Sequence, residues 1–281
     1  MKKITFFNTK GGTGKTTVCF NYGWYLAEKH NKKILFLDFD PQVNLLQALT
    51  QNITTPTNKC LENLIVDYLS KKELNFDNYI ININENMDIL PTSYNISLLE
   101  EYLTDYLIEK AFYDKELNKS YERVSIINQI LKDFIPTKYD YLIIDSQPNY
   151  SLLSNIALAF ANNLIIVLKP EIFSFLDIKY LIRIINNLNE KFKININVIG
   201  LLINAYEKRK KTSKIIVTKL YEKYNSTFDI VPNKIRYLAN YHESIFKEGK
   251  PIFLSYPHSE ATEDLLKTFN YIDILIEKKI S

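Results

Sequence analysis

Eight residues near the N-terminus combine glycines, lysines and threonines in the way that a phosphate-binding loop requires. They are Lys10, Gly11, Gly12, Thr13, Gly14, Lys15, Thr16 and Thr17. Glycines this closely spaced let the backbone turn tightly and point successive N–H groups at one oxyanion. Lys15 then supplies a positive charge for the outer phosphates, and Thr16 supplies a hydroxyl for Mg²⁺. A glycine-rich turn without a ligand is the alternative, but it leaves two lysines crowded in one loop with no anion between them.

Two later segments end in carboxylates after continuous apolar runs. One run starts at residue 34 and leads into Asp38 and Asp40, and the other starts at residue 139 and leads into Asp145. Such runs are typical of parallel strands that are buried on both faces, and ligands collect at the carboxyl ends of these strands. If the strands are parallel neighbours, these carboxylates point towards the same crevice as the loop.

The elements that must position these residues alternate between strand and helix. Apolar runs and periodicity predict strands at residues 4–8, 34–38, 87–91, 139–145, 164–168 and 198–204. Helical spacing follows residue 16 and recurs over residues 45–80, 98–107, 124–134, 177–192, 212–224 and 263–279. Residues 110–122 lack a clean period and are expected to form a surface excursion. The alternation predicts an α/β fold with a doubly wound, mostly parallel sheet flanked by helices.

Composition sets the limits of this interpretation. The chain has 281 residues, which fits one large domain over residues 1–281 better than two small ones. Its formal net charge of +3 means that attraction to nucleic acid requires a local basic patch. Cys19 and Cys60 lie far apart and form no C-x-x-C, so neither a disulfide framework nor a metal clip is expected. No apolar run approaches the length of a membrane span.

The loop and the two strand ends together resemble one known family. K-G-G-x-G-K-T-T is similar to the deviant Walker A motif of the ParA/MinD group of P-loop ATPases, with Thr9 where the ordinary motif has its first glycine. Asp38 to Gln42 resembles the Walker A′ segment of ParA proteins, although Val43 stands where these proteins usually have glycine. Asp145 resembles the Walker B aspartate. The chain therefore looks like a short ParA-type partition ATPase, without room before residue 10 for an operator-binding domain.

This resemblance implies ATP and Mg²⁺ as cofactors and assigns roles to single residues. Lys15 and Lys10 neutralise phosphate charge, and each protomer of an ATP-dependent homodimer sends its Lys10 to the partner's phosphates. Asp40 positions the attacking water and is also a candidate to hold Mg²⁺ through a water. Thr16 holds the ion directly and Asp145 holds it through a water. Residues 230–236 resemble the late strand of this family, and in relatives the regions of Asn204 and Pro232 frame the adenine.

The resemblance also implies partners. Such ATPases are slow alone, are stimulated by a ParB-like centromere-binding protein, and act in the cytoplasm on nucleoid DNA. A basic run predicts the surface for non-specific DNA binding, although such a run is often only a solvated face. The expected DNA contacts are Lys208, Arg209, Lys210, Lys211, Lys214 and Arg236.

Three other functions are weighed against partition. A MinD-like ATPase would bind membrane, and the apolar stripe of the terminal helix is its candidate anchor, although docking on the sheet explains the stripe equally well. ATP-dependent binding to DNA or to lipid vesicles discriminates the two, and we expect no membrane partner. A metal-cluster carrier needs paired cysteines, which this chain lacks. A ligase of the dethiobiotin synthetase type shares the expected fold, but no residue pattern identifies its substrate pocket.

Overall fold

The strand order places the predicted loop near the middle of a parallel sheet. Within residues 1–51, 59–93, 96–113 and 119–280, which the computed structural model describes, seven strands form one sheet in the order β3-β4-β2-β5-β1-β6-β7. All neighbouring pairs are parallel except β3 with β4. The strands are β1 (Lys2–Phe7), β2 (Ile34–Phe39), β3 (Ile81–Asn84), β4 (Met87–Pro91), β5 (Tyr141–Ser146), β6 (Asn163–Leu168) and β7 (Asn197–Ile203). The predicted doubly wound, mostly parallel fold is confirmed.

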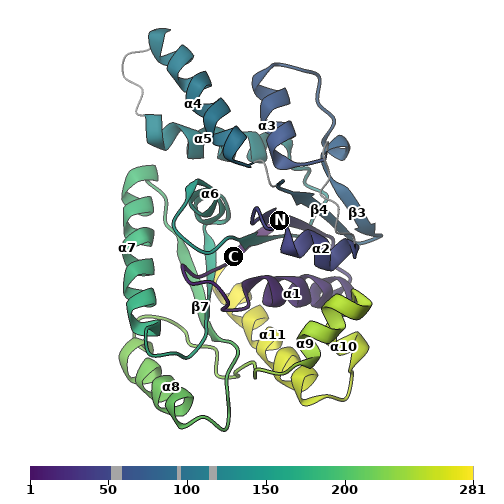
Figure 1. Ribbon diagram of the computed structural model, residues 1–281, viewed down its shortest axis with the longest axis vertical. Helices are drawn as coiled ribbons and strands as arrows, with labels where there is room; N and C mark the ends of the chain where they lie inside the picture. The colour runs from purple at the N-terminus through teal and green to yellow at the C-terminus, as the bar shows by residue number, and fades with distance from the viewer. Residues whose placement is uncertain (52–58, 94–95, 114–118, 281) are drawn as a thin grey trace.

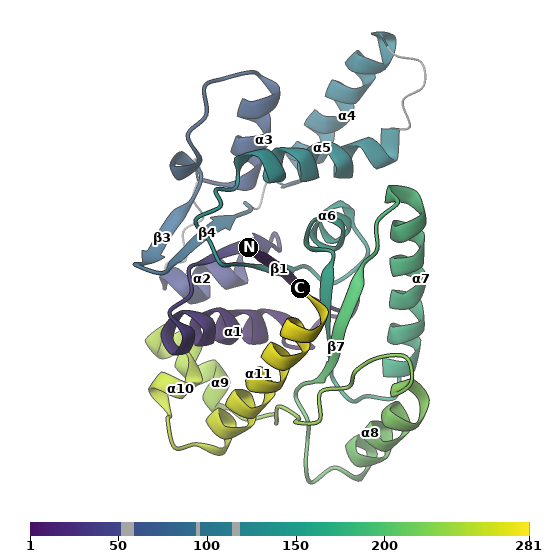
Figure 2. The same ribbon diagram turned by 180° about the vertical axis from the view of Figure 1, so that it is seen from behind.

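Helices cover both faces of this sheet. They are α1 (Lys15–His30), α2 (Asn44–Thr50), α3 (Leu61–Leu69), α4 (Ile96–Tyr113), α5 (Lys119–Phe134), α6 (Leu152–Ala161), α7 (Ser174–Phe192), α8 (Lys211–Tyr224), α9 (Asn240–Glu243), α10 (Ile252–Ser255) and α11 (Glu260–Lys279). A 3₁₀ turn, η1 (Phe76–Asn78), and a π-helical turn, η2 (Ser244–Glu248), complete the assignment. In Figures 1 and 2, α1 and α11 lie together on one side of the sheet, while α7 and α8 stand beside β7.

Alternating side chains of the strands fill the core on both faces. In β2, Ile34 and Phe36 pack in the cluster that includes α1, α2 and α11, whereas Leu35 and Leu37 pack in the cluster that includes α3, α5 and α6. All four side chains have no exposed surface. This two-sided burial is why the strands are continuous apolar runs.

The terminal helix uses its apolar stripe for this packing. Leu265, Phe269, Ile272 and Ile276 of α11 are each 0% exposed and belong to the same cluster as α1. The stripe therefore docks on the core, as one of the two interpretations expected. In the described part of the chain, no helix is long and apolar enough to span a membrane.

Three expectations differ from the structure. Residues 230–236 do not form a named strand. They form isolated bridges, Leu201 of β7 with Ile230 and Tyr206 with Arg236, and the Ile235 N–H donates to the Ile203 carbonyl at 3.0 Å. The expected excursion at 110–122 is largely occupied by helix ends, because α4 runs to Tyr113 and α5 begins at Lys119; residues 114–118 lie outside the described residues. The short edge strand β3, in which isoleucine alternates with asparagine, was not predicted.

Candidate functional site

The loop between β1 and α1 adopts the backbone conformation that its glycines permit. Gly12 and Gly14 have φ values of 70° and 83°, in the left-handed region that favours glycine. Gly14 is the N-cap residue of α1, makes no side-chain cap, and is followed by a first turn without acidic residues. The first N–H groups of α1 are therefore suited to an anion, as at helix N-termini that bind phosphate.

Two asparagines hold this loop against the sheet. Asn204, directly after β7, donates from Nδ2 to the Thr13 carbonyl at 2.7 Å, and a Cβ on Gly14 would lie 2.2 Å from the same Nδ2. Asn8, which sequence reasoning missed, donates from Nδ2 to the Val167 carbonyl at 2.8 Å and accepts from the Lys10 N–H at 3.1 Å. A buried polar residue at the end of an apolar strand was the signal for Asn8. Both contacts fix the loop before any ligand binds.

A cavity of about 350 Å³ opens in front of the loop, and we call it the phosphate chamber. Its lining includes residues 11, 12 and 14–17 of the loop, together with Asp40, Asn44 and Ile245. Asp40 is 7% exposed and accepts a hydrogen bond from the Gln42 N–H at 3.0 Å. The structure thus brings the predicted loop residues and Asp40 to one space.

Lys15 is the buried cation of this chamber. Only 6% of the Lys15 surface is exposed, and its Nζ donates to the Lys10 carbonyl at 3.2 Å. Burial lowers the pKa of Lys15, while the negative charges of Asp145 and Asp40 oppose this shift. A phosphate anion in the chamber would add to the charge that keeps Lys15 protonated.

Two carboxylates lie side by side beneath the chamber. Asp38 and Asp145 are paired in register on β2 and β5, and both are 0% exposed. Asp38 accepts from the N–H groups of Asp40 at 3.2 Å and Leu46 at 3.0 Å. Burial, then the charge of Asp145, raises the pKa of Asp38. Two acids this close and this deeply buried oppose each other's ionisation.

Asp145 carries the atom that best fits a metal site. Its Oδ1 accepts from the Ser146 N–H at 3.1 Å, whereas Oδ2 is a buried oxygen without a hydrogen-bond partner in the described part of the chain. Burial raises the pKa of Asp145 to about 7, against the hydrogen bond from Thr16 and the charge of Lys15. Such an orphaned oxygen is costly unless a cation or water pairs with it. Asp145 and Thr16 therefore fit Mg²⁺, which takes few carboxylates and keeps several waters.

Replacing Asp145 with Asn is expected to stabilise the ligand-free protein at pH 8. Because the pKa of Asp145 is raised on folding, the folded state binds more protons than the unfolded state between pH of about 4 and about 7. The wild-type free energy of unfolding should thus fall as pH rises through this window. Asn cannot ionise, so the variant should gain on the order of 2 kcal/mol at pH 8 and little at pH 4.

Thermal unfolding in EDTA across this pH range measures the effect. The control is Asp140→Asn, which alters an exposed carboxylate just before β5. If the stability difference between Asp145→Asn and the wild type does not change with pH, the pKa of Asp145 is not raised on folding.

Lys10, at the start of the loop, forms an ion pair within its own chain. Its Nζ donates to Oε2 of Glu171, which follows β6, and Glu171 also pairs with Lys169 at 2.8 Å. The hydrogen bond from Lys10, then that from Lys169, lowers the pKa of Glu171 to about 2. Sequence reasoning missed Glu171, because 161 residues separate it from Lys10.

Val43, the residue before α2, has an unfavourable backbone conformation. Its φ of 48° and ψ of 33° are left-handed, which is rare for a β-branched residue, and its side chain is 0% exposed. Val43 ends the turn that Asp40 begins, since its N–H donates to the Asp40 carbonyl at 2.8 Å. This conformation gives a physical reason for glycine at the same position in similar proteins; holding valine there costs about 1–2 kcal/mol.

A second cavity, of about 170 Å³, lies beside the loop, and we call it the side pocket. Its lining includes Gly12, Gly14, Asn204, residues 235–238, Tyr241 and Leu265. Asn204 therefore borders both the loop and this pocket. Pro232 lines neither the side pocket nor the phosphate chamber.

The residues expected to contact DNA divide into two groups. Lys208, Arg209, Lys210, Lys211 and Lys214 are all exposed, at or just before the start of α8. Lys210 pairs with Glu207 at 3.0 Å. Arg236 instead has a side chain that is 17% exposed and is paired with Glu260 and Asp264 of α11. Arg236 therefore differs from the exposed residues of the basic run, because its charge is paired with two carboxylates.

Comparison with known sequences places the chain in a family. Residues 1–198 match the family model described as an AAA domain. The chain is 29% identical over 280 residues to the virulence plasmid ParA family protein pGP5-D of Chlamydia psittaci, covering 97% of this chain and 95% of the relative. It is 30% identical over 261 residues to the uncharacterised protein MJECL24 of Methanocaldococcus jannaschii, covering 90% and 91%.

Solved structures show the same fold. An ATP complex of McdA from Cyanothece has a TM-score of 0.78 at 22% identity, covering 99% of this chain and 96% of the other. A plasmid partition protein of Borrelia burgdorferi has a TM-score of 0.67 at 19% identity, covering 99% and 98%. MinD of Pyrococcus horikoshii, complexed with Mg-ADP, has a TM-score of 0.68 at 21% identity, covering 100% and 99%. The chain thus belongs to the AAA domain family, is similar in sequence to ParA family proteins, and shares its fold with MinD.

Proposed function

We propose that this ParA/MinD-group protein is a Mg²⁺-dependent ATPase that dimerises with ATP, binds DNA without sequence preference and segregates plasmid or chromosomal DNA. A ParB-like partner would stimulate it, in the cytoplasm and on the nucleoid. The observation that carries the ATPase is the phosphate chamber, with Lys15 and Asp40 in its lining and the orphaned Asp145 carboxylate beside Lys15. The ParA family name of the Chlamydia relative supports partition as the process served.

In the proposed hydrolysis of ATP, each of a few side chains would have a separate role. Water attacks the γ-phosphorus, the bond to the β–γ bridging oxygen breaks, ADP leaves, and the proton of the water passes to phosphate. Asp40 accepts a hydrogen bond from the attacking water and orients it. Lys15 and the α1 N–H groups stabilise the charge on the transferred group and on ADP. Thr16 would hold Mg²⁺ directly, and Asp145 and Asp40 would hold it through water; the ion would supply further positive charge at the phosphates.

Lys10 would complete the site of a second protomer. Its engagement with Glu171 supports a lysine that is held outside its own chamber, with 36% of its side chain exposed. To reach the phosphates of a partner, Lys10 must exchange this carboxylate for phosphate oxygens. The exchange is favoured only when a triphosphate is present on the opposite protomer, so it would couple dimerisation to ATP.

Asp40→Ala is expected to bind ATP normally, lose at least about 100-fold in hydrolysis rate, and accumulate as a dimer. The reason is that Asp40 lies across the chamber from the loop, where it can orient water but does not grip phosphate. The measurement combines single-turnover hydrolysis with sedimentation in ATP. Adding Lys10→Ala to Asp40→Ala should return the protein to monomer, and Lys29→Ala, at an exposed position of α1, is the control.

Wild-type hydrolysis by Asp40→Ala would remove Asp40 from the mechanism. A stable dimer of the Lys10→Ala double variant would exclude the trans role of Lys10.

The start of α8 supports DNA as the surface on which the protein works. Lys211 and Lys214 lie in the first turn of α8, which holds no acidic residue, and the N-cap Lys210 makes no side-chain cap. Positive side chains there add to the positive end of the helix dipole, an arrangement that favours phosphate oxygens. ATP-dependent dimerisation would bring two such patches onto one duplex.

The MinD-like alternative, an ATPase that binds membrane, has less support. Its candidate anchor was the apolar stripe of α11, and the side chains of this stripe are buried against the core. DNA binding is therefore the function we propose.

A further inference from the structure

The outer wall of the side pocket has little secondary structure of its own. Residues 235–238 belong to no helix or named strand. Their backbone is attached to β7 through the Ile235 N–H, which donates to the Ile203 carbonyl at 3.0 Å. It is also attached to Tyr206, after β7: the Tyr206 N–H donates to the Ile235 carbonyl at 2.9 Å, and the Tyr237 N–H donates to the Tyr206 carbonyl at 3.1 Å. These bonds fix one edge of the wall, and the other edge depends on side chains.

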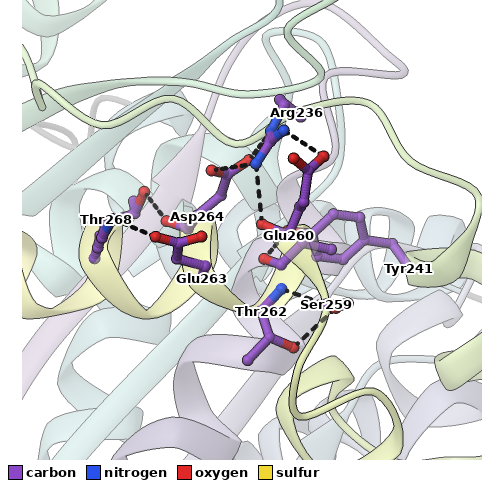
Figure 3. A network of polar contacts seen from close by, with 10 residues as sticks. Arg236, Tyr241, Ser259, Glu260, Thr262, Glu263, Asp264 and Thr268 are labelled. Atoms are coloured by element: carbon purple, nitrogen blue, oxygen red, sulfur yellow. Dashed lines mark hydrogen bonds and ion pairs between the residues drawn. The ribbon is translucent and has the colours of Figure 1, made fainter.

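Arg236 makes the main side-chain attachment of this wall. Its Nε and Nη2 donate to the two carboxylate oxygens of Asp264 at 2.5 and 3.0 Å, and Nη1 donates to Glu260 at 2.5 Å (Figure 3). Asp264 and Glu260 are four residues apart on α11, so both face the guanidinium. Only 17% of the Arg236 side chain and 18% of the Asp264 side chain are exposed. A bidentate, partly desolvated pair of this kind is directional and strong.

Two further contacts join the same wall to α11. The Tyr241 hydroxyl, from a side-pocket residue that is 6% exposed, donates to the Ala261 carbonyl at 2.9 Å (Figure 3). Leu265, one residue after Asp264, lines the side pocket itself and is 0% exposed. Since α11 is packed on β7 and α1, it is a rigid reference for the wall.

We propose that Arg236, Asp264 and Glu260 form a clamp that positions the pocket wall for the nucleobase of the bound nucleotide. The inference rests on the proposed ATPase function and adds residues that act through the wall instead of touching phosphate. The pocket begins at Gly12 and Gly14 of the loop, so a nucleotide whose phosphates fill the chamber places its base here. Because two carboxylates surround one guanidinium, the local charge is negative, which disfavours Arg236 as a DNA phosphate contact.

Asp264→Asn and Arg236→Met are expected to raise the KM for ATP about tenfold while leaving kcat within about twofold. Binding of tripolyphosphate, which has no base, should be unchanged, because it uses only the loop. Arg236→Lys should fail to restore the KM, since an ammonium cannot reproduce the fork that spans both carboxylates. The measurements are steady-state kinetics with ATP and calorimetry with tripolyphosphate.

Glu263 supplies the matched control. It lies in the same turn of α11 but pairs with Lys267 at 2.5 Å on the surface, with both side chains 59% exposed. Glu263→Gln should therefore leave the KM for ATP unchanged. If Asp264→Asn does not fold, Glu260→Gln removes only one arm of the clamp and should raise the KM to a smaller degree.

The outcomes separate the clamp from the function on which it rests. If the wild type binds neither ATP nor tripolyphosphate, the proposed function fails. If it binds both but the clamp variants weaken both equally, or change neither KM nor affinity, the clamp is overturned while the ATPase stands. A rise in KM for ATP alone, with tripolyphosphate unaffected, supports the clamp.

Discussion

Replacing Lys15 with alanine should reduce ATP affinity by at least about 100-fold while the protein remains folded. Lys15 is the buried cation of the phosphate chamber, and losing one partner of a buried ion pair typically costs about 3–5 kcal/mol. In this chamber the loss is compounded, because Asp145 and Asp40 then face the phosphates without the charge that offsets them.

Two measurements test this expectation. Calorimetry should give no detectable heat of Mg-ATP binding for Lys15→Ala or Lys15→Gln. Thermal unfolding provides a second readout, since a ligand at 100 times its Kd stabilises the folded state by about 2.7 kcal/mol, and this gain should vanish in the variants. Lys29→Ala, on the same helix but exposed, is the control. Wild-type affinity in Lys15→Ala would refute the assignment of the loop.

Reversing the charge of Lys208, Arg209, Lys210 and Lys211 to Glu should weaken ATP-dependent DNA binding by at least about 100-fold at physiological salt. The four side chains are exposed, and each phosphate contact contributes a slope of about −0.9 to the dependence of log affinity on log salt. A dimer that uses four such contacts per protomer should thus show a steep salt dependence, which the variant should largely lose. ATP affinity should change little, because none of these residues lines the phosphate chamber.

An electrophoretic shift assay and a vesicle flotation assay, each with ATP and with ADP, decide between the two functions. Reversal of Lys33, Lys71, Lys72 and Lys138, four residues that are also exposed but distant from α8 in the chain, controls for the change in net charge. Equal loss of DNA binding in both variants would mean that attraction is only global. Flotation that requires ATP, without any DNA shift, would overturn partition in favour of a membrane-bound ATPase.

The two tests address different parts of the molecule. The Lys15 variants probe the edge of the sheet where β1 and β5 end, and the α8 variants probe a helix beside β7 (Figure 1). A protein that fails the first test but passes the second would bind DNA in an ATP-dependent manner through a nucleotide site other than this loop.

Several features of the site were accessible from the sequence because they are local. A phosphate loop is built from consecutive residues, so the spacing of Gly12, Gly14 and Lys15 is itself the evidence for the cradle that the left-handed backbone provides. Apolar runs that end in Asp38 and Asp145 similarly indicate parallel strands and a polar edge. Parallel strands buried on both faces leave few other arrangements, which is why the fold class was also predictable.

The late segment at 230–236 shows where this reasoning ends. The segment resembles a late strand, but Pro232 lacks an N–H for a sheet ladder, and isolated bridges with a few further hydrogen bonds join it to β7 and Tyr206. Propensity describes what a segment can form alone. Which neighbours complete its hydrogen bonds is decided by the rest of the fold.

By itself, the sequence determined the phosphate loop, the carboxylates at the strand ends and the parallel α/β sheet, because short-range spacing encodes all three. Only the tertiary structure showed that two of the predicted basic site residues are paired with carboxylates. Lys10 meets Glu171 across 161 residues, and Arg236 is neutralised by α11. Only the fold showed that the stripe of α11 faces the core. Contacts between distant residues depend on how helices cross the sheet, and neither residue type nor periodicity specifies that packing.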